Sequence, residues 1–436
     1  MADPSAVRAE AEVRLWGETV GALVELEGGR ILFEYAEAFR RGGLEISPIH
    51  LPLALSGPRS FEELRRKDAF RGLPGVLADA LPDAFGRRVI RAWYAARDEP
   101  ERALSPVQQL LYVGERALGA LTFHPAQESR PAEQEALEVQ ALAHDARRIV
   151  EGKTDVVVPE IYRIGSSAGG KRPKAIVHFD PGTGTIRSGG TELRAGEVPC
   201  LLKFDGIGAD HTADELGSPQ PYNRVEAAYA DMARAAGVDM PEIEVLEVDG
   251  YAHLLIRRFD LRDGSRIHQH TLGGMLHVDY NDVGAASYEE YLRTVQRLGM
   301  AYDALTRAVV RMTFNVLAVN QDDHVKNFSF HMDPSGTWSL TPAYDVTFAK
   351  GEGWTRTHQM RIRDRLTGFR EEDLTAVADA FGVKKPREIV ARVREAVGGW
   401  ETHAARYGVP PDAVRAVRRE LDRRDEEVFA GGPAPA

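Results

Sequence analysis

The sequence of 436 residues predicts an α+β fold in two lobes, with a β-rich part first and a mainly helical part last. Three patterns lead to this expectation. Apolar and polar residues alternate around glycine turns from residue 13 to residue 35, as in a β-meander. Strand and helix patterns are mixed between 137 and 270. Beyond 271 the apolar residues recur mainly at helical spacing.

These patterns divide the chain into four segments. We expect a β-rich N-terminal subdomain over 1–126, a mixed part over 137–270, a helical lobe over 271–430 and a disordered tail over 431–436. The polar stretch 127–135 has no apolar period, which indicates a linker. With 43% hydrophobic residues in 48.1 kDa, the chain can bury more than one core.

The individual elements follow from the same patterns. In the first part, the predicted strands are 13–15, 21–26, 31–35 and 119–123, and the predicted helices lie within 72–86, in the basic stretch after it and over 106–112. The mixed part has a helix through 143–150, strands 175–179 and 201–204, a helix over 222–236, and strands 243–248 and 253–259. Gly237 is a typical C-cap for the second of these helices. The last part contains a long helical stretch over 288–319 and further helices over 373–421.

Composition narrows the classes of function. The net charge of −11 and the pI of about 5.7 argue against a surface built to grip nucleic-acid phosphates. The single cysteine, Cys200, lies in an apolar run and is expected to be a buried strand thiol. Because the sequence has no long apolar run and no secretory leader pattern, we expect a cytoplasmic protein without a membrane segment.

The segment Asn320–Asn327 carries the pattern that points most directly to chemistry. Asp322 precedes Asn327 by five residues, and Asp345 follows a predicted hairpin with a turn at 333–336. A phosphotransferase needs one carboxylate to orient the substrate hydroxyl. It also needs an amide and a second carboxylate to hold the Mg²⁺ that bridges the ATP phosphates. We therefore expect Asp322 to be the catalytic base, and Asn327 and Asp345 to bind Mg²⁺.

The same loop leaves some assignments open. Asp323 is adjacent to Asp322 and could be the base instead, although its spacing to Asn327 fits less well. His324 could hold the loop by a hydrogen bond, and Lys326 could reach the γ-phosphate or be solvated. We count His324 and Lys326 among the candidate nucleotide-binding residues.

Upstream features complete the order of parts expected for an ATP site. A glycine-rich loop allows backbone N–H groups to approach phosphate oxygens closely. Its residues are Gly165, Ser166, Ser167, Ala168, Gly169 and Gly170. A basic run that ends at Lys174 follows this loop. Lys203 lies within an apolar run, where it could point into a cleft toward the phosphates, and Glu226 is the acidic residue expected to pair with it. The other glycine cluster, at 182–184, is expected to be a hairpin end.

Taken together, these motifs resemble the HipA family of serine/threonine kinases, the toxins of bacterial HipBA-type toxin–antitoxin pairs. The resemblance spans about residues 13–421 and is carried by the segments 33–35, 73–83, 165–174, 202–204, 257–260, 320–327 and 344–345. It implies a bilobal protein-kinase-like (HipA-like) fold with a β-rich N-terminal subdomain and a mainly helical C-terminal lobe.

The resemblance also implies roles for residues and partners. Asp322 would be the base, Asn327 and Asp345 the Mg²⁺ ligands and Lys203 the lysine that contacts ATP. Ser167, or its neighbour Ser166, would be the serine whose autophosphorylation switches the kinase off. Expected partners are a HipB-like helix-turn-helix antitoxin and a protein substrate such as an aminoacyl-tRNA synthetase, with DNA reached only through the antitoxin.

Two other functions remain open on the sequence. The order Asp322, His324, Asn327 is also similar to the catalytic segment of phosphoinositide kinases, so a small-molecule or lipid kinase is one alternative. The absence of a basic amphipathic face argues against a membrane substrate. The other alternative is a non-catalytic corepressor that stabilises its antitoxin on DNA. The intact set of candidate catalytic groups argues against it.

Overall fold

The computed structural model describes residues 6–95, 104–126, 136–152, 172–207 and 220–430. Contacts divide the chain into two units. Unit 1 comprises Met1–Gln220, Glu244–His270 and Pro334–Gly336, and unit 2 comprises Pro221–Ile243, Thr271–Asp333 and Thr337–Ala436. The predicted 137–270 part is thus divided between them, because the helix after Pro221 packs on helices of unit 2.

Unit 1 begins with an antiparallel sheet in the order β3-β2-β1-β4. Its strands are β1 (Val7–Leu15), β2 (Glu18–Leu26), β3 (Ile31–Tyr35) and β4 (Leu121–His124). Alternate side chains of these strands, such as Val13, Leu15 and Phe123, are buried, as the alternating sequence predicts. The predicted β-meander is confirmed.

The helices described in unit 1 are α1 (Glu37–Gly42), α2 (Gly75–Ala78), α3 (Ala84–Ala95), α4 (Pro106–Val113) and α5 (Val139–Val150). Four of them, α2 to α5, lie at predicted positions, whereas α1 was not predicted. A short 3-10 turn, η1 (Glu62–Leu64), lies between α1 and α2. Ser105 starts α4 with a capping box, in which its hydroxyl and the Gln108 side chain satisfy each other's backbone N–H groups.

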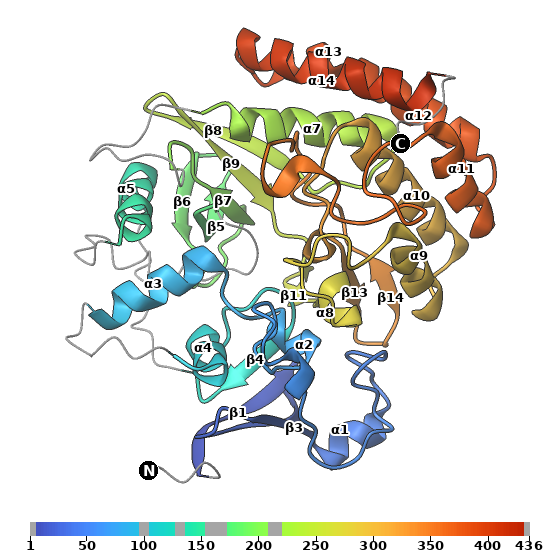
Figure 1. Cartoon of the computed structure of the whole chain (residues 1–436). Coiled ribbons are helices and arrows are strands. Elements are labelled where there is room, and N and C mark those ends of the chain that lie inside the picture. Colours follow the sequence, from blue (N-terminus) through green and yellow to red (C-terminus); the bar gives the residue numbers. More distant parts are fainter. Residues whose placement is uncertain (1–5, 96–103, 127–135, 153–171, 208–219, 431–436) are drawn as a thin grey trace. The chain divides into compact units, whose positions relative to one another are not determined.

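A second sheet of unit 1 has the order β6-β5-β7-β9-β8 (Figure 1). Its strands are β5 (Lys174–Asp180), β6 (Thr185–Ser188), β7 (Val198–Lys203), β8 (Ile243–Val248) and β9 (Tyr251–Arg257). Apolar residues of α3 and α5 pack on β5 and β7 in one hydrophobic core. Cys200 is buried in that core, as predicted, and the 182–184 glycine cluster is the turn between β5 and β6.

The end of β7 is held by a buried carboxylate. Asp205 accepts hydrogen bonds from the backbone N–H groups of Gly206, Gln220 and Ala252, at 2.7, 3.0 and 2.9 Å. The Asp205 N–H in turn donates to Nδ1 of His253, at 3.1 Å. Burial lowers the pKa of His253 to about 4, against the attraction of Asp205, so this imidazole is neutral at pH 7.

Three short strands follow β9. They are β10 (Leu261–Arg262), β11 (Ser265–Arg266) and β12 (His268–Thr271), and β10 pairs with β11 in an antiparallel hairpin. Asp260, before β10, is fully buried, and its pKa stays low because Arg258 and the Gly119 N–H outweigh the effect of burial. These contacts attach the chain after β9 to the N-terminal sheet of unit 1.

Unit 2 is mainly helical. Its helices are α7 (Tyr222–Ala236), α8 (Leu272–Leu276), α9 (Tyr288–Arg297), α10 (Tyr302–Leu317), α11 (Glu371–Ala380), α12 (Pro386–Gly398), α13 (Trp400–Arg406) and α14 (Pro411–Phe429). Gly237 ends α7 at φ 93°, which confirms the predicted C-cap. The helical stretch predicted over 288–319 is two helices instead. Gly299, at φ 66°, separates α9 from α10.

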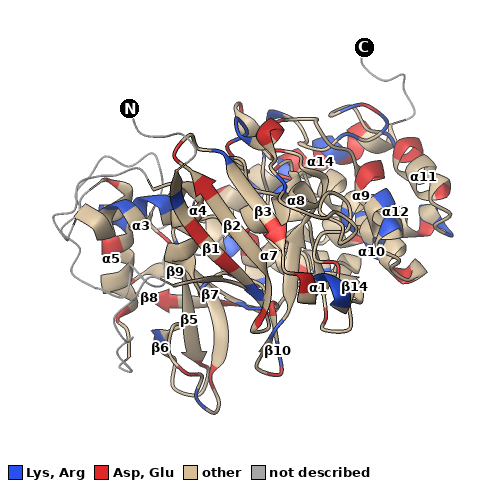
Figure 2. Ribbon diagram, turned by 90° about the horizontal axis from the view of Figure 1, so that it is seen from below, with Lys and Arg blue, Asp and Glu red and all other residues tan. Residues whose placement is uncertain are grey.

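Unit 2 also holds an antiparallel hairpin of β13 (Ser329–Met332) and β14 (Trp338–Leu340). Acidic and basic residues are interspersed on these helices rather than gathered by sign (Figure 2). Ion pairs such as Arg394–Asp425, between α12 and α14, account for part of this mixing. In the described ranges, no helix has both the length and the apolar character needed to cross a membrane. The predicted α+β class is confirmed.

Candidate active site

The segment that carries the candidate catalytic residues leaves the C-terminal end of α10 through a strained residue. Val319 has φ 54°, a left-handed conformation that β-branched residues rarely adopt. Two backbone hydrogen bonds hold it there. The Ala349 N–H donates to Val319 O at 3.1 Å, and the Gln321 N–H donates to Ala349 O at 3.0 Å. The loop therefore starts from a fixed backbone geometry.

Asp322 is the accessible carboxylate of the loop. Its side chain is 39% exposed, and its Oδ1 accepts a hydrogen bond of 2.8 Å from the indole N–H of Trp354. Nε2 of His324 lies 4.0 Å from the same oxygen. These contacts orient the carboxylate from one side and leave part of it open to a substrate hydroxyl.

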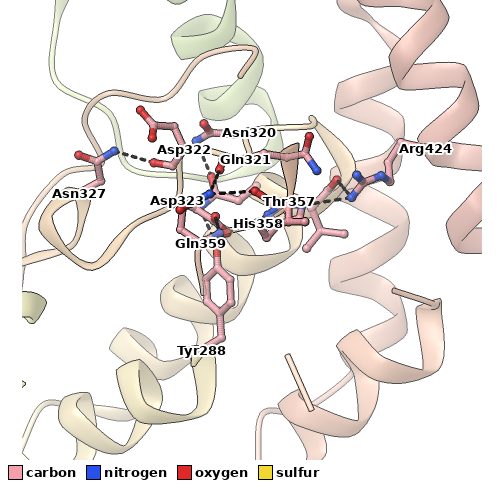
Figure 3. A network of polar contacts seen from close by, with 12 residues as sticks. Tyr288, Asn320, Gln321, Asp322, Asp323, Asn327, Thr357, His358, Gln359 and Arg424 are labelled. Atoms are coloured by element: carbon pink, nitrogen blue, oxygen red, sulfur yellow. Dashed lines mark hydrogen bonds and ion pairs between the residues drawn. The ribbon is translucent and has the colours of Figure 1, made fainter. Parts of the chain in front are cut away.

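Asp323, its neighbour, is fully buried and engaged on both oxygens (Figure 3). Oδ2 accepts from the Tyr288 hydroxyl at 2.7 Å and lies 2.8 Å from Nδ1 of His358. Oδ1 accepts from the backbone N–H of Gln359 at 2.7 Å. Burial alone would raise the pKa of Asp323, but the hydrogen bonds from His358, Gln359 and Tyr288 keep it below its usual range. Asp323 is an ionised anchor inside the protein, and no substrate hydroxyl can reach it.

Asn327 has its amide oriented by the loop itself. Its Nδ2 donates to the backbone oxygen of Asp322 at 2.8 Å, so Oδ1 points away from that contact (Figure 3). Arg311 of α10 donates to the backbone oxygen of Asn327, and its guanidinium lies 4.2 Å from the centre of the Phe328 ring. Asn327 ends the 3-10 turn η2 (Val325–Asn327). The oxygen, the atom that Mg²⁺ prefers, is the part of this amide left for a cation.

The hairpin returns Asp345 toward this loop. Tyr344 donates its hydroxyl to the backbone oxygen of Lys326 at 2.7 Å and also contacts the Ser329 hydroxyl. Asp345 follows at φ 52°, a left-handed conformation. Burial lowers the pKa of His324, while Asp322 and Asp345 act in the opposite direction.

The basic and aromatic side chains of the loop form a small group of their own. The Lys326 ammonium lies 5.3 Å from the centre of the Tyr280 ring. The His324 ring is 5.4 Å from Tyr280 and 6.4 Å from Trp354, between centroids. His324 thus packs between two aromatic rings, and the predicted hydrogen bond that would hold the loop stays a prediction.

The donors present fit magnesium. Among the described residues, no group of three or more His, Cys, Asp or Glu side chains is arranged to hold a metal ion alone. Magnesium that binds with a nucleotide needs only one or two protein carboxylates or amides, because phosphates and water supply the other ligands. Asn327 and Asp345 would be those ligands here.

Unit 1 carries two of the predicted nucleotide-binding lysines. Lys203, on β7, is 5% exposed and lies opposite Lys174 of β5 in the sheet register. The Lys174 ammonium is 3.6 Å from the Asp83 carboxylate, and both side chains are buried. Asp83 also accepts from the Gly86 N–H at 2.7 Å, as an N-cap of α3 would. The charge of Lys174 is therefore paired with that of Asp83, a residue of the N-terminal subdomain.

The remaining predicted residues are distributed as follows. Glu226 is buried on α7 of unit 2, and its pairing with Lys203 stays a prediction. The residues of the glycine-rich loop lie outside the described residues: Gly165, Ser166, Ser167, Ala168, Gly169 and Gly170.

Sequence reasoning missed several residues that shape the loop. Trp354 contacts Asp322. Tyr288, His358 and Gln359 contact Asp323 directly, and Arg424 contacts His358. No spacing rule links them, because they come from α9, α14 and the segment between β14 and α11. A weak signal was available in α10, where Asn315 interrupts an apolar face. Its amide donates to the Tyr288 hydroxyl at 2.9 Å.

A second polar chain in unit 1 has the order of a hydrolase triad. The Ser47 hydroxyl lies 3.0 Å from Nε2 of His270, and Nδ1 of His270 lies 2.6 Å from Asp79. Ser47 and His270 are 1% and 0% exposed. Since an acyl substrate must reach the serine, we assign this chain to the attachment of the Ser47 loop.

Comparisons with known proteins agree with the resemblance seen in the sequence. Residues 11–124 match the HipA N-terminal domain, and residues 166–400 match the HipA-like C-terminal domain. "Putative kinase Y4dM" of Sinorhizobium fredii is 24% identical over 408 residues, which cover 88% of this chain and 90% of that protein. "Putative kinase Y4mE" of the same organism is 30% identical over 132 residues, 28% of this chain and 31% of that protein.

A solved structure shares the fold. It is HipA of Shewanella oneidensis MR-1, from a complex of its toxin–antitoxin system with HipB and operator DNA. The match has a TM-score of 0.68 at 18% identity and covers 96% of this chain and 97% of that one. With both domain matches in their expected order along the sequence, the chain belongs to the HipA family.

Proposed function

We propose that the protein is an ATP- and Mg²⁺-dependent serine/threonine protein kinase. One observation carries the proposal: of two adjacent aspartates, the buried Asp323 anchors the loop, whereas the Asp322 side chain is exposed and its backbone oxygen orients the Asn327 amide by accepting from Nδ2. This arrangement places one carboxylate for a hydroxyl and one oxygen ligand for a cation on the same short loop.

The proposed reaction follows from these positions. Asp322 accepts the hydrogen bond of the substrate hydroxyl and takes its proton as the oxygen bonds to the γ-phosphorus. The bond between that phosphorus and the β–γ bridging oxygen breaks, and ADP leaves with the electron pair. When bound, Mg²⁺ would neutralise phosphate charge. Trp354 keeps Asp322 oriented by donating to Oδ1, which leaves its other oxygen for the substrate.

Regulation is proposed on the family resemblance. Phosphorylation of Ser167, or of Ser166, would add a charge of about −1.5 to −2 to the glycine-rich loop. This charge would repel the ATP phosphates and switch the kinase off. The complex of the Shewanella protein with HipB and operator DNA supports a HipB-like antitoxin as partner. The acidic charge of −11 fits contact with DNA through that partner.

The test is phosphate transfer from labelled ATP with Mg²⁺, using wild type beside Asp322→Asn, with mass mapping of the labelled residue. We expect label on a serine of the 165–170 loop in wild type and none in the variant. Normal ATP binding without label would favour a small-molecule acceptor or a non-catalytic corepressor. Failure to bind ATP would refute the kinase assignment.

A further inference from the structure

A chain of hydrogen bonds runs from α14 to the candidate catalytic loop. Arg424 of α14 contacts His358 at 3.1 Å, from Nη1 to Nε2, and His358 contacts Asp323 at 2.8 Å (Figure 3). His358 and Asp323 have fully buried side chains, and Arg424 is 5% exposed. The reaction proposed above uses none of these three side chains directly.

The chemistry of Arg424 fixes the direction of every bond in this chain. A guanidinium can only donate, so Nε2 of His358 must accept with its lone pair. The ring proton is then on Nδ1, which faces the ionised carboxylate of Asp323 and donates to it. The Tyr288 hydroxyl donates to the same oxygen and accepts from Asn315. Each group thus has one orientation.

Arg424 holds the start of the loop as well. Its Nη1 also donates to Val316 O at 3.2 Å, near the last turn of α10. That carbonyl belongs to a helix end, where backbone oxygens need partners and a cation is favourable. Asn320, just after α10, donates to Asn315 at 3.0 Å and so joins the same network. One side chain of α14 therefore contacts both the helix before the loop and the histidine beneath it.

Burying the Arg424 guanidinium costs free energy, because its charge is removed from water. A buried charge needs partners, yet the one carboxylate that Arg424 contacts in the described network is Glu427, 3.2 Å away on its own helix. Its other two partners there are a neutral imidazole and a carbonyl. The guanidinium therefore orients two neutral groups, the His358 ring and the Val316 carbonyl.

We propose that His358 and Arg424 are positioning residues of the kinase. Arg424 selects the Nδ1-protonated form of His358, which holds Asp323 and with it the neighbouring Asp322. This inference rests on the proposed function for its effect on rate. The tautomer itself is independent of that function.

The first test compares two substitutions of similar size at His358. His358→Asn keeps an N–H close to the Nδ1 position and can still donate to Asp323, whereas His358→Leu cannot. We expect His358→Leu to lower kcat about 10- to 100-fold, the usual effect of losing a partner behind a catalytic group, while the KM for ATP stays within about 2-fold. His358→Asn should recover most of the rate. Equal loss in both, in step with their melting temperatures, would overturn the proposal.

The second test needs no kinase activity. In wild type labelled with ¹⁵N-histidine, long-range ¹H–¹⁵N spectra distinguish protonated from unprotonated ring nitrogens. His358, assigned from the signal lost in His358→Asn, should be neutral with its proton on Nδ1. Arg424→Met should shift it toward a mixture of tautomers, and Arg424→Lys should shift it less. A proton on Nε2 in wild type would refute the proposal. An inactive wild type with the expected tautomer would refute only the kinase assignment.

Discussion

Replacing each of the two adjacent aspartates by asparagine should separate stability from activity. Asp323→Asn should destabilise unit 2 strongly, because Asp323 is fully buried and accepts three hydrogen bonds. Asp322→Asn should leave stability nearly unchanged, because Asp322 is 39% exposed and an amide oxygen can still accept the hydrogen bond from the Trp354 indole. It should abolish phosphate transfer, because an amide cannot take the proton of the substrate hydroxyl.

The magnitude follows from counting donors. An asparagine in place of Asp323 presents one oxygen and one NH₂ group, so at least one of the three donors faces another donor. A buried polar group left without its partner costs about 1–3 kcal/mol, and the other two bonds lose their charge assistance. We expect a loss of about 3–5 kcal/mol for Asp323→Asn and at most about 1 kcal/mol for Asp322→Asn.

Urea unfolding at pH 7, followed by tryptophan fluorescence, measures both changes. Because the pKa of Asp323 is held below its usual range, its contribution to stability is present above the unfolded-state pKa and is lost as pH falls through the folded-state pKa. The difference between wild type and Asp323→Asn should therefore narrow below about pH 4. Equal destabilisation by the two substitutions, or a stable and inactive Asp323→Asn, would refute the division of roles.

Three further predictions follow from other sites. Ser167→Ala should keep kinase activity but lose self-inactivation during preincubation with ATP, and equal rates of decay in variant and wild type would contradict this. Asp83→Asn keeps an N-cap acceptor but breaks the buried pair with Lys174, so thermal and urea unfolding should show a loss of about 3–5 kcal/mol. The control, Asp68→Asn, removes an exposed pair and should change stability by less than about 0.5 kcal/mol. Because His253 is neutral in the fold and becomes charged on unfolding, stability should decrease as the pH is lowered from 6.5 to about 4. His253→Phe should flatten this dependence of stability on pH. An unchanged dependence would show that other groups cause it.

Local sequence determined the elements and the order of the chemical groups. The strands β1 to β3, the helix α7 with its Gly237 cap and the β13–β14 hairpin all appear where alternation, helical period and turn residues predict them. These signals depend on neighbours within a few residues, which is why they can be read directly. The break at Gly299 was missed because the apolar period continues across it.

The tertiary structure decided what the two aspartates can do. In sequence, Asp322 and Asp323 are adjacent and chemically identical, and spacing alone could not exclude either. Tyr288 and His358, each 35 residues away, and the Gln359 N–H occupy the oxygens of the buried Asp323, and Arg424 of α14 contacts His358 behind it. Burial and hydrogen-bond partners come from packing between distant segments, so no local pattern can specify them. The sequence therefore determined which groups are present, and packing determined which of them a substrate can reach.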